Sequence, residues 1–211
     1  MIKTISALCV LALVSSPFLS ASEYVIQPAP DCEVHLTVYK TGLMRGKSHS
    51  FMFERYHGIL RYDATKPEAS AVSLDIESAS AICKDTWVSS KDLRKIEAFA
   101  LNDMLDSGHH PSIHFESAVV KPLQAKAYEV QGTLTIRDIA KPVKVSVTVD
   151  GVSEEFLTFR CNAVIRLTDY RLRPPTAGLG TIGTKDEMTT EFRLKAVKKS
   201  ATQVSRPVHA S

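Results

Sequence analysis

The chain has 211 residues, 44% hydrophobic and 23% charged, which is enough apolar content for one domain with a sizeable core. Its net charge is +3, but five basic residues lie near the two ends: Lys3, Lys195, Lys198, Lys199 and Arg206. The rest of the chain carries 21 basic and 23 acidic side chains. This balance excludes a strongly basic face and predicts that nucleic acid is not a partner.

Residues 1–22 have the pattern of a secretory signal peptide. A positive charge near the N-terminus precedes an uncharged, largely apolar run over residues 5–19, and the small residues Ala21 and Ser22 follow. A retained membrane anchor is the alternative, but the run is short and is interrupted around Pro17. We expect cleavage near Ala21-Ser22 and a periplasmic or secreted protein.

Three cysteines remain after such cleavage, namely Cys32, Cys83 and Cys161. An oxidising compartment permits one disulfide among them and leaves one thiol over, and the sequence does not assign the pair. Cys161 falls on the apolar face of a predicted strand. Cys83 is expected to be more exposed, where the neighbouring Lys84 would lower the pKa of its thiol.

Apolar and polar residues alternate along most of the chain, which is typical of strands with one buried and one solvated face. The predicted strands, in chain order, lie near residues 33–39, 50–53, 58–62, 72–77, 113–115, 133–137, 143–149, 157–167 and 187–197. About eight or nine such strands separated by turns indicate an all-β sandwich or barrel. We favour an antiparallel barrel, because closure removes the exposed sheet edges.

One segment, residues 89–105, departs from this alternation and is predicted to be a short helix. Ser89 is a suitable N-cap, and Gly108 and Pro111 stop the helix. Its apolar positions recur three or four residues apart, at Leu93, Ile96, Phe99 and Ala100. In a barrel, this helix is expected to lie near one mouth.

The barrel is expected to span residues 23–197. The small, polar and basic residues 198–211 are predicted to form a disordered tail. Their positive charges would allow peripheral contact with an anionic membrane.

Histidines are the first candidates for chemistry. Cys32 and His35 are three apart on a strand and therefore point to opposite faces. His109, His110 and His114 are interrupted by a proline and form no helical ligand set. His49 and His57 bracket an apolar stretch, so a His-dependent metal protein or hydrolase remains an alternative. We predict no metal site, since catalytic metal sites usually need three well-placed ligands.

No nucleophile or phosphate site is apparent. The chain has no Gly-x-Ser-x-Gly elbow, and no cysteine lies beside an obvious base. The glycines of residues 176–183 lack the lysine of a P-loop and the strand–helix setting of a dinucleotide site. We interpret this segment as a flexible loop at a barrel mouth, and we predict neither catalytic residues nor a cofactor.

Several sequence segments, in their order and spacing, resemble the YceI-like family of exported isoprenoid-binding proteins. The similarity runs from about Tyr24 to Val197. Its main pieces are residues 24–26, residues 40–43, the predicted helix end at 100–105, the following segment 110–115, and residues 132–143. The last piece resembles the family's G-x-L-T-I-x-G-x-x-K-P-V hairpin, with Asp138 where glycine is usual.

The resemblance implies a lipocalin-like extended antiparallel β-barrel with a short helix and an apolar tunnel. Family members bind polyisoprenoid, quinone-like or fatty-acyl molecules, and some form dimers, so a lipid ligand and a homodimer are expectations here. His49 is similar to a histidine near the tunnel in many relatives. The candidate lumen residues are Leu36, Val38, His49, Phe51, Phe53, Leu74, Trp87, Ile96, Phe99, Phe115 and Phe159. The alternative is a structural barrel whose interior is filled by these side chains.

Overall fold

The computed structural model describes residues 21–199, and these form one antiparallel sheet of eleven strands. The strands are β1 (Ser22–Ile26), β2 (Glu33–Gly42), β3 (Ser48–Phe53), β4 (Tyr56–Tyr62), β5 (Ala71–Glu77), β6 (Ala81–Cys83), β7 (Ser112–Gln124), β8 (Ala127–Ile136), β9 (Ile139–Val152), β10 (Phe156–Arg166) and β11 (Ile182–Lys198). Helix α1 spans Ser90–Phe99, a π-helical turn continues it over Ala100–Met104, and single 3-10 turns lie at Pro67–Ala69, Ser78–Ser80 and Thr168–Tyr170.

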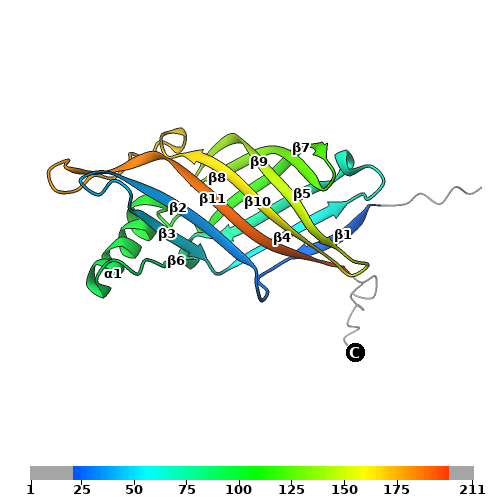
Figure 1. Cartoon of the computed structure of the whole chain (residues 1–211), viewed down its shortest axis with the longest axis horizontal. Coiled ribbons are helices and arrows are strands. Elements are labelled where there is room, and N and C mark those ends of the chain that lie inside the picture. The colour runs from blue at the N-terminus through cyan, green and yellow to red at the C-terminus, as the bar shows by residue number, and fades with distance from the viewer. Residues whose placement is uncertain (1–20, 200–211) are drawn as a thin grey trace, which may run out of the picture.

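Eight of the strands close into a barrel, in the order β1-β4-β5-β7-β8-β9-β10-β11, and β11 pairs back onto β1. The closure is short: Tyr24 lies opposite Lys198 and Ile26 opposite Ala196. The strands run diagonally around an elongated body (Figure 1). This confirms the expected all-β, lipocalin-like barrel with one short helix.

The barrel wall is extended at one end by β2, β3 and β6, which continue from the N-terminal part of β11. Strand β11 can serve both groups because it is 17 residues long: Ile182–Arg193 faces β2, and the last residues face β1. Its pairing with β2 shifts between Thr184 and Met188, which marks a bulge. The added strands lengthen one side of the barrel beyond the closed ring.

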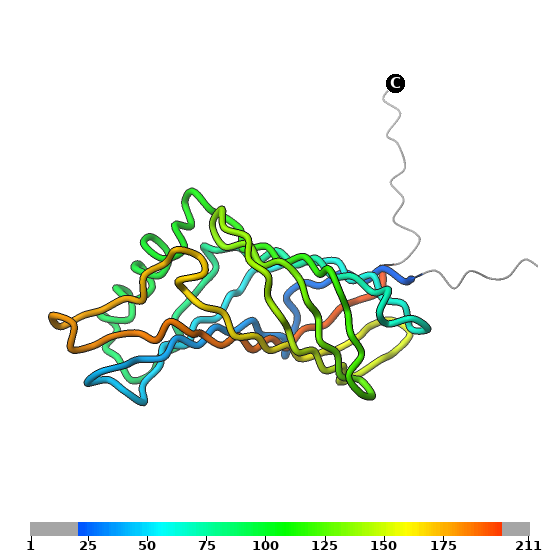
Figure 2. Tube along the Cα trace, turned by 90° about the horizontal axis from the view of Figure 1, so that it is seen from above, coloured from blue at the N-terminus to red at the C-terminus, as the bar shows by residue number. Residues whose placement is uncertain are grey.

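Helix α1 lies at the end of the molecule formed by β3 and β6, as does the connection from β10 to β11 (Figures 1 and 2). The predicted cap is present, since the Ser89 side chain accepts a hydrogen bond from the Asp92 amide at 3.2 Å. Strand β1 and the end of β11 lie at the opposite end (Figure 2). The two ends therefore differ in construction.

The densest core lies toward the end that holds β1. Ile26, Val34 and Ala196 are completely buried, and Leu157 is nearly so. On β9, by contrast, the inward-facing valines are only partly buried. The alternation predicted from the sequence is therefore present along the wall, and side chains around Ile26 and Leu157 fill the barrel at the end with β1.

The bounds of several predicted elements differ from those in the structure. Strands β1 and β6 were not predicted as strands, and β11 reaches Lys198, one residue into the predicted tail. Lys199 still donates a backbone hydrogen bond to the Glu23 carbonyl, at 2.9 Å. The proposed signal peptide up to residue 20, and the tail from residue 200, lie outside the described residues.

The described part of the chain contains no helix long and apolar enough to cross a membrane. Its three cysteines are all unpaired. The expectation for Cys83 was wrong: its side chain is buried, and desolvation raises the pKa of its thiol to about 11. Burial therefore outweighs the neighbouring lysine.

Candidate ligand-binding cavity

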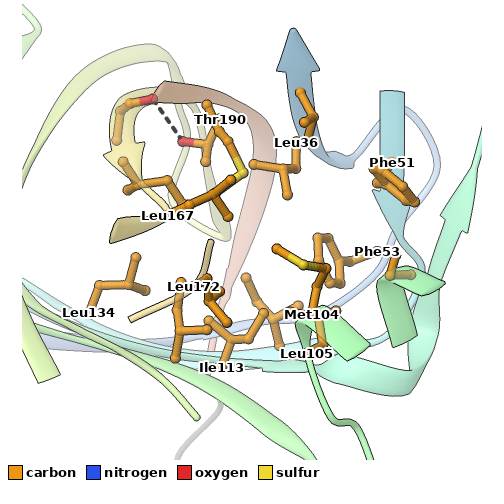
Figure 3. A pocket seen from close by; sticks show the side chains of 18 of the residues that line it. Leu36, Phe51, Phe53, Met104, Leu105, Ile113, Leu134, Leu167, Leu172 and Thr190 are labelled. Atoms are coloured by element: carbon orange, nitrogen blue, oxygen red, sulfur yellow. Dashed lines mark hydrogen bonds between the residues drawn. The ribbon is translucent and has the colours of Figure 1, made fainter. Parts of the chain in front are cut away.

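A cavity of about 430 Å³ occupies the barrel interior. It lies within the usual size range of small-molecule sites. Side chains from α1 and from every strand except β4 line it, and all but six of them are apolar. Figure 3 shows Leu36, Phe53, Ile113, Leu134 and Leu172 converging on one space from different sides. The interior is thus an apolar chamber rather than a completely filled core.

The cavity reaches the surface at the end with α1. Among its lining residues in the described chain, the only exposed ones are Lys95, Phe99, Thr176 and Ala177. Two of these belong to α1 and two to the connection between β10 and β11. At its inner limit the cavity is bounded by the fully buried Ile26 and by Leu194. The cavity therefore has a closed apolar bottom and a mouth framed by the helix and a loop.

Nine of the eleven predicted lumen residues line this cavity: Leu36, Val38, His49, Phe51, Phe53, Leu74, Ile96, Phe99 and Phe115. The alternation of strands accounts for this placement, because residues 49, 51 and 53 of β3 all point inward. That these side chains contact a ligand stays a prediction.

The other two predicted lumen residues, Trp87 and Phe159, do not line this cavity. Trp87 stacks on the outer side of the site against His49, with ring centroids 5.4 Å apart, and donates its Nε1 hydrogen bond to the Ser48 carbonyl at 3.1 Å. Phe159 is inward-facing but belongs to the packed core, opposite Leu194 of β11. The cavity ends before it because that end of the barrel is filled.

The predicted lumen residues leave out most of the lining, including inward positions of β9 and β10 such as Val143 and Ile165, and Leu172 after β10. Leu167 and Leu172 flank the turn after β10, which is closed by the Leu172 amide bonding to the Leu167 carbonyl at 3.0 Å. Asp186 fixes this turn from β11, accepting hydrogen bonds from the amide and hydroxyl of Thr168 at 2.9 and 2.7 Å. Leu167 ends the predicted strand 157–167, but Leu172 lies in a turn that carries no periodic signal, so alternation could not place it.

A buried polar cluster lies beside the apolar lining, on β3 and the segment after β6. His49 Nδ1 is 2.5 Å from Asp85 Oδ2, and the Ser50 amide donates to Asp85 Oδ1 at 3.0 Å. The Asp85 side chain is only 2% exposed. Both carboxylate oxygens of Asp85 are hydrogen-bonded, so the carboxylate is held in place and fixes the orientation of the His49 ring.

Together with Cys83, these side chains form the one group of three potential metal ligands in the described chain, with ligand atoms within 4.8 Å of one another. Tetrahedral zinc would separate ligand nitrogen and oxygen atoms by roughly 3.3 Å. The 2.5 Å separation of His49 and Asp85 is that of a hydrogen bond and leaves no room for an ion between them. Hydrogen bonding accounts for the cluster as it stands.

The His49 and His57 pairing considered from the sequence is not supported. His49 is buried on the cavity side of β3. His57 has a largely exposed side chain and lies 3.7 Å from Asp75 on the neighbouring strand.

A closed antiparallel barrel around an apolar chamber is the architecture that lipocalins share. Within that architectural class, the chain belongs to the YceI-like family, whose model matches residues 24–196. A UPF0312 protein of Pseudomonas savastanoi pv. phaseolicola is 27% identical over 187 residues, which cover 82% of this chain and 88% of that protein.

Two solved structures share the fold. BcnA from Burkholderia cenocepacia matches with a TM-score of 0.62 and 21% identity, over 78% of this chain and 95% of BcnA. A polyisoprenoid binding domain from Saccharophagus degradans matches with a TM-score of 0.58 and 14% identity, over 83% of this chain and 98% of that domain.

Proposed function

We propose that this protein binds one long-chain lipid, a polyisoprenoid, an isoprenoid quinone or a fatty-acyl chain, inside its barrel, and carries or stores it outside the cytoplasm. The observation that carries the proposal is the enclosed apolar cavity with a single framed mouth. The similarity to a polyisoprenoid binding domain supports the same ligand class. Export rests on the sequence pattern of residues 1–22.

The energetics favour a long chain over a short one. Each buried methylene contributes about 0.8 kcal/mol, so ten of them give roughly 8 kcal/mol, the scale of micromolar binding. Immobilising the ligand consumes several kcal/mol of this. Chains well beyond ten carbons are therefore expected to bind tightly, and short ones weakly.

We also propose that the protein acts by binding and not by catalysis. The thiol that faces the cavity, Cys161, is kept protonated because burial raises its pKa to about 12. A protonated thiol is a poor nucleophile. No acidic side chain of the described chain lines the cavity, so a general base of that kind is not available there.

Neighbouring residues on β10 provide a matched test. Ala163 lines the cavity, whereas the next residue, Val164, is exposed on the outside of the barrel. In delipidated protein, Ala163→Phe should reduce uptake of a fluorescent long-chain fatty acid at least tenfold by filling the chamber. Val164→Phe should leave uptake unchanged.

The same pair separates an open chamber from a filled core. In a filled core, Ala163→Phe would overpack and cost about 1–3 kcal/mol of unfolding free energy. In an open chamber it should cost little, as measured by urea denaturation. Unchanged uptake in Ala163→Phe would contradict binding in the lumen.

A further inference from the structure

The charge lining the cavity is all of one sign. Its charged lining residues are Lys40 and Lys95, joined by the titratable His49, and no aspartate or glutamate of the described chain lines it. The nearby acids are turned to other partners. Asp85 holds His49 and Ser50, Glu97 accepts from the Cys83 amide at 2.9 Å, and Asp92 accepts at the helix N-terminus and pairs with Lys95 at 3.5 Å. A ligand with a cationic head group would find no counter-charge on the cavity wall.

The polar lining residues gather on adjacent strands near the mouth. Lys40 of β2 lies directly opposite Thr184 of β11. His49 of β3 lies opposite Val38, two residues before Lys40 on β2. The cavity face of β2 thus changes from apolar at Leu36 and Val38 to cationic at Lys40. An amphiphile that enters the barrel with its tail first would match this change from apolar to cationic side chains.

Lys40 and Thr184 have side chains with unused binding capacity. In residues 21–199, neither the Lys40 ammonium nor the Thr184 hydroxyl makes a side-chain hydrogen bond or an ion pair, whereas the cavity's Thr190 hydroxyl donates to the Ala163 carbonyl at 3.4 Å (Figure 3). Lys40 is half-buried, and desolvation lowers the pKa of its amine. The Asp85 carboxylate makes no hydrogen bond to this amine and affects its pKa only as a more distant negative charge. An ammonium held near apolar walls without a bonded partner is stabilised by an incoming anion.

His49 is oriented for the same role. Its Nδ1 is bound to Asp85, and its ring is stacked on Trp87 at an interplanar angle of 13°. The ring position is therefore fixed, and Nε2 is the nitrogen without a partner in the described chain. In the imidazolium form, Nε2 donates a hydrogen bond to a ligand oxygen.

We propose that Lys40, His49 and Thr184 form a head-group site for anionic oxygens, so that the bound lipid carries a carboxylate or a phosphate at the mouth and its chain in the barrel. The inference rests on the proposed lipid binding and adds the head-group class and the orientation of the ligand. Lys95 on α1 lies at the same mouth, where its ammonium is paired with Asp92 at 3.5 Å, so among the described residues Lys40 is the unpaired cation of the site.

The test compares ligands with one chain and different heads. Palmitate, hexadecanol and hexadecylamine are titrated into delipidated protein at low ionic strength, with isothermal calorimetry as the readout. Palmitate should bind about tenfold more tightly than hexadecanol, since charge-assisted hydrogen bonds are stronger than neutral ones, and hexadecylamine should bind most weakly. A parallel titration with geranylgeranyl monophosphate and geranylgeraniol shows whether a phosphate or a carboxylate is preferred.

Variants of Lys40 test whether the proposed head-group site causes the preference for palmitate over hexadecanol. Lys40→Met should bring palmitate within about threefold of hexadecanol, because the charge-assisted contact to the carboxylate is lost. Lys40→Arg keeps the charge and should keep the preference. Lys185→Met is the matched control: this lysine is next to Thr184 on β11 but exposed outside the cavity, over the Tyr39 ring. It should change nothing.

The outcomes separate the two proposals. Equal binding of palmitate and hexadecanol, or a preference that survives in Lys40→Met, overturns the head-group site while leaving lipid binding intact. Failure of all the long-chain ligands to bind a correctly folded protein overturns lipid binding itself.

Discussion

At the scale of single residues, one buried side-chain oxygen of the described chain has no hydrogen bond. The Tyr56 hydroxyl is buried with no hydrogen-bond partner among the described residues, and desolvation raises the pKa of Tyr56 to about 12. An unpaired buried hydroxyl carries a desolvation cost. Tyr56→Phe should therefore be neutral or raise the unfolding free energy by about 1 kcal/mol, as measured by chemical denaturation. A clear loss of stability would show that the hydroxyl has a partner in solution.

The cysteines provide a second prediction at this scale. Burial raises the thiol pKa of Cys83 to about 11 and that of Cys161 to about 12. At pH 8 the thiolate fraction of Cys83 is then about one in a thousand. In native protein, iodoacetamide should modify the partly exposed Cys32 first and leave the other two, as mass spectrometry of digests would show. Rates for Cys83 should rise as the pH approaches 11. Rapid labelling of Cys83 at pH 8 would contradict its burial.

The site shows what residue patterns alone can give. The inward positions of β3 were found because alternation assigns them to one face. The partner that fixes His49 was not found, because Asp85 lies 36 residues away and follows a strand of only three residues. Such a short strand has too little alternation to place the residues after it. Trp87 follows the same short strand and lies outside the cavity lining.

At the scale of elements, the long strands were predictable and the turns were not. Strands β9 and β10 alternate over many residues, so their faces could be assigned from the sequence. The mouth depends on the connection from β10 to β11, where hydrogen bonds from Thr168 to Asp186 fold a segment with no periodicity. Helix α1 was predicted because its cap and apolar stripe are local features.

Strand β8 provides a prediction about close packing. A Cβ added at Gly132 would lie 2.4 Å from the Glu116 carbonyl oxygen and 2.6 Å from the Phe115 ring. Since Phe115 lines the cavity, Gly132→Ala should destabilise the barrel by about 1–3 kcal/mol and displace that ring, which alters the chamber. Gly108→Ala is the control, because nothing lies within 4 Å of the added atom. Equal stability of the two variants, in urea melts, would contradict the packing of β7 against β8.

At the scale of the whole molecule, the barrel divides its interior into a packed end and an open one. The packed end, around Ile26 and Leu157, supplies the stability that a single domain needs. The open end can therefore remain a chamber. Its lining loses packing contacts that a filled core would make, and a bound chain would restore them. Ligand binding should accordingly raise the melting temperature with ligand concentration.

The most direct test of lipid binding is native mass spectrometry of the protein, purified without delipidation and compared with the same sample after organic extraction. The account predicts one added mass per chain in the range of a long-chain lipid, removed by extraction, restored on incubation with the extract, and absent in Ala163→Phe. A bare chain mass in every sample, with no uptake from the extract, would contradict it.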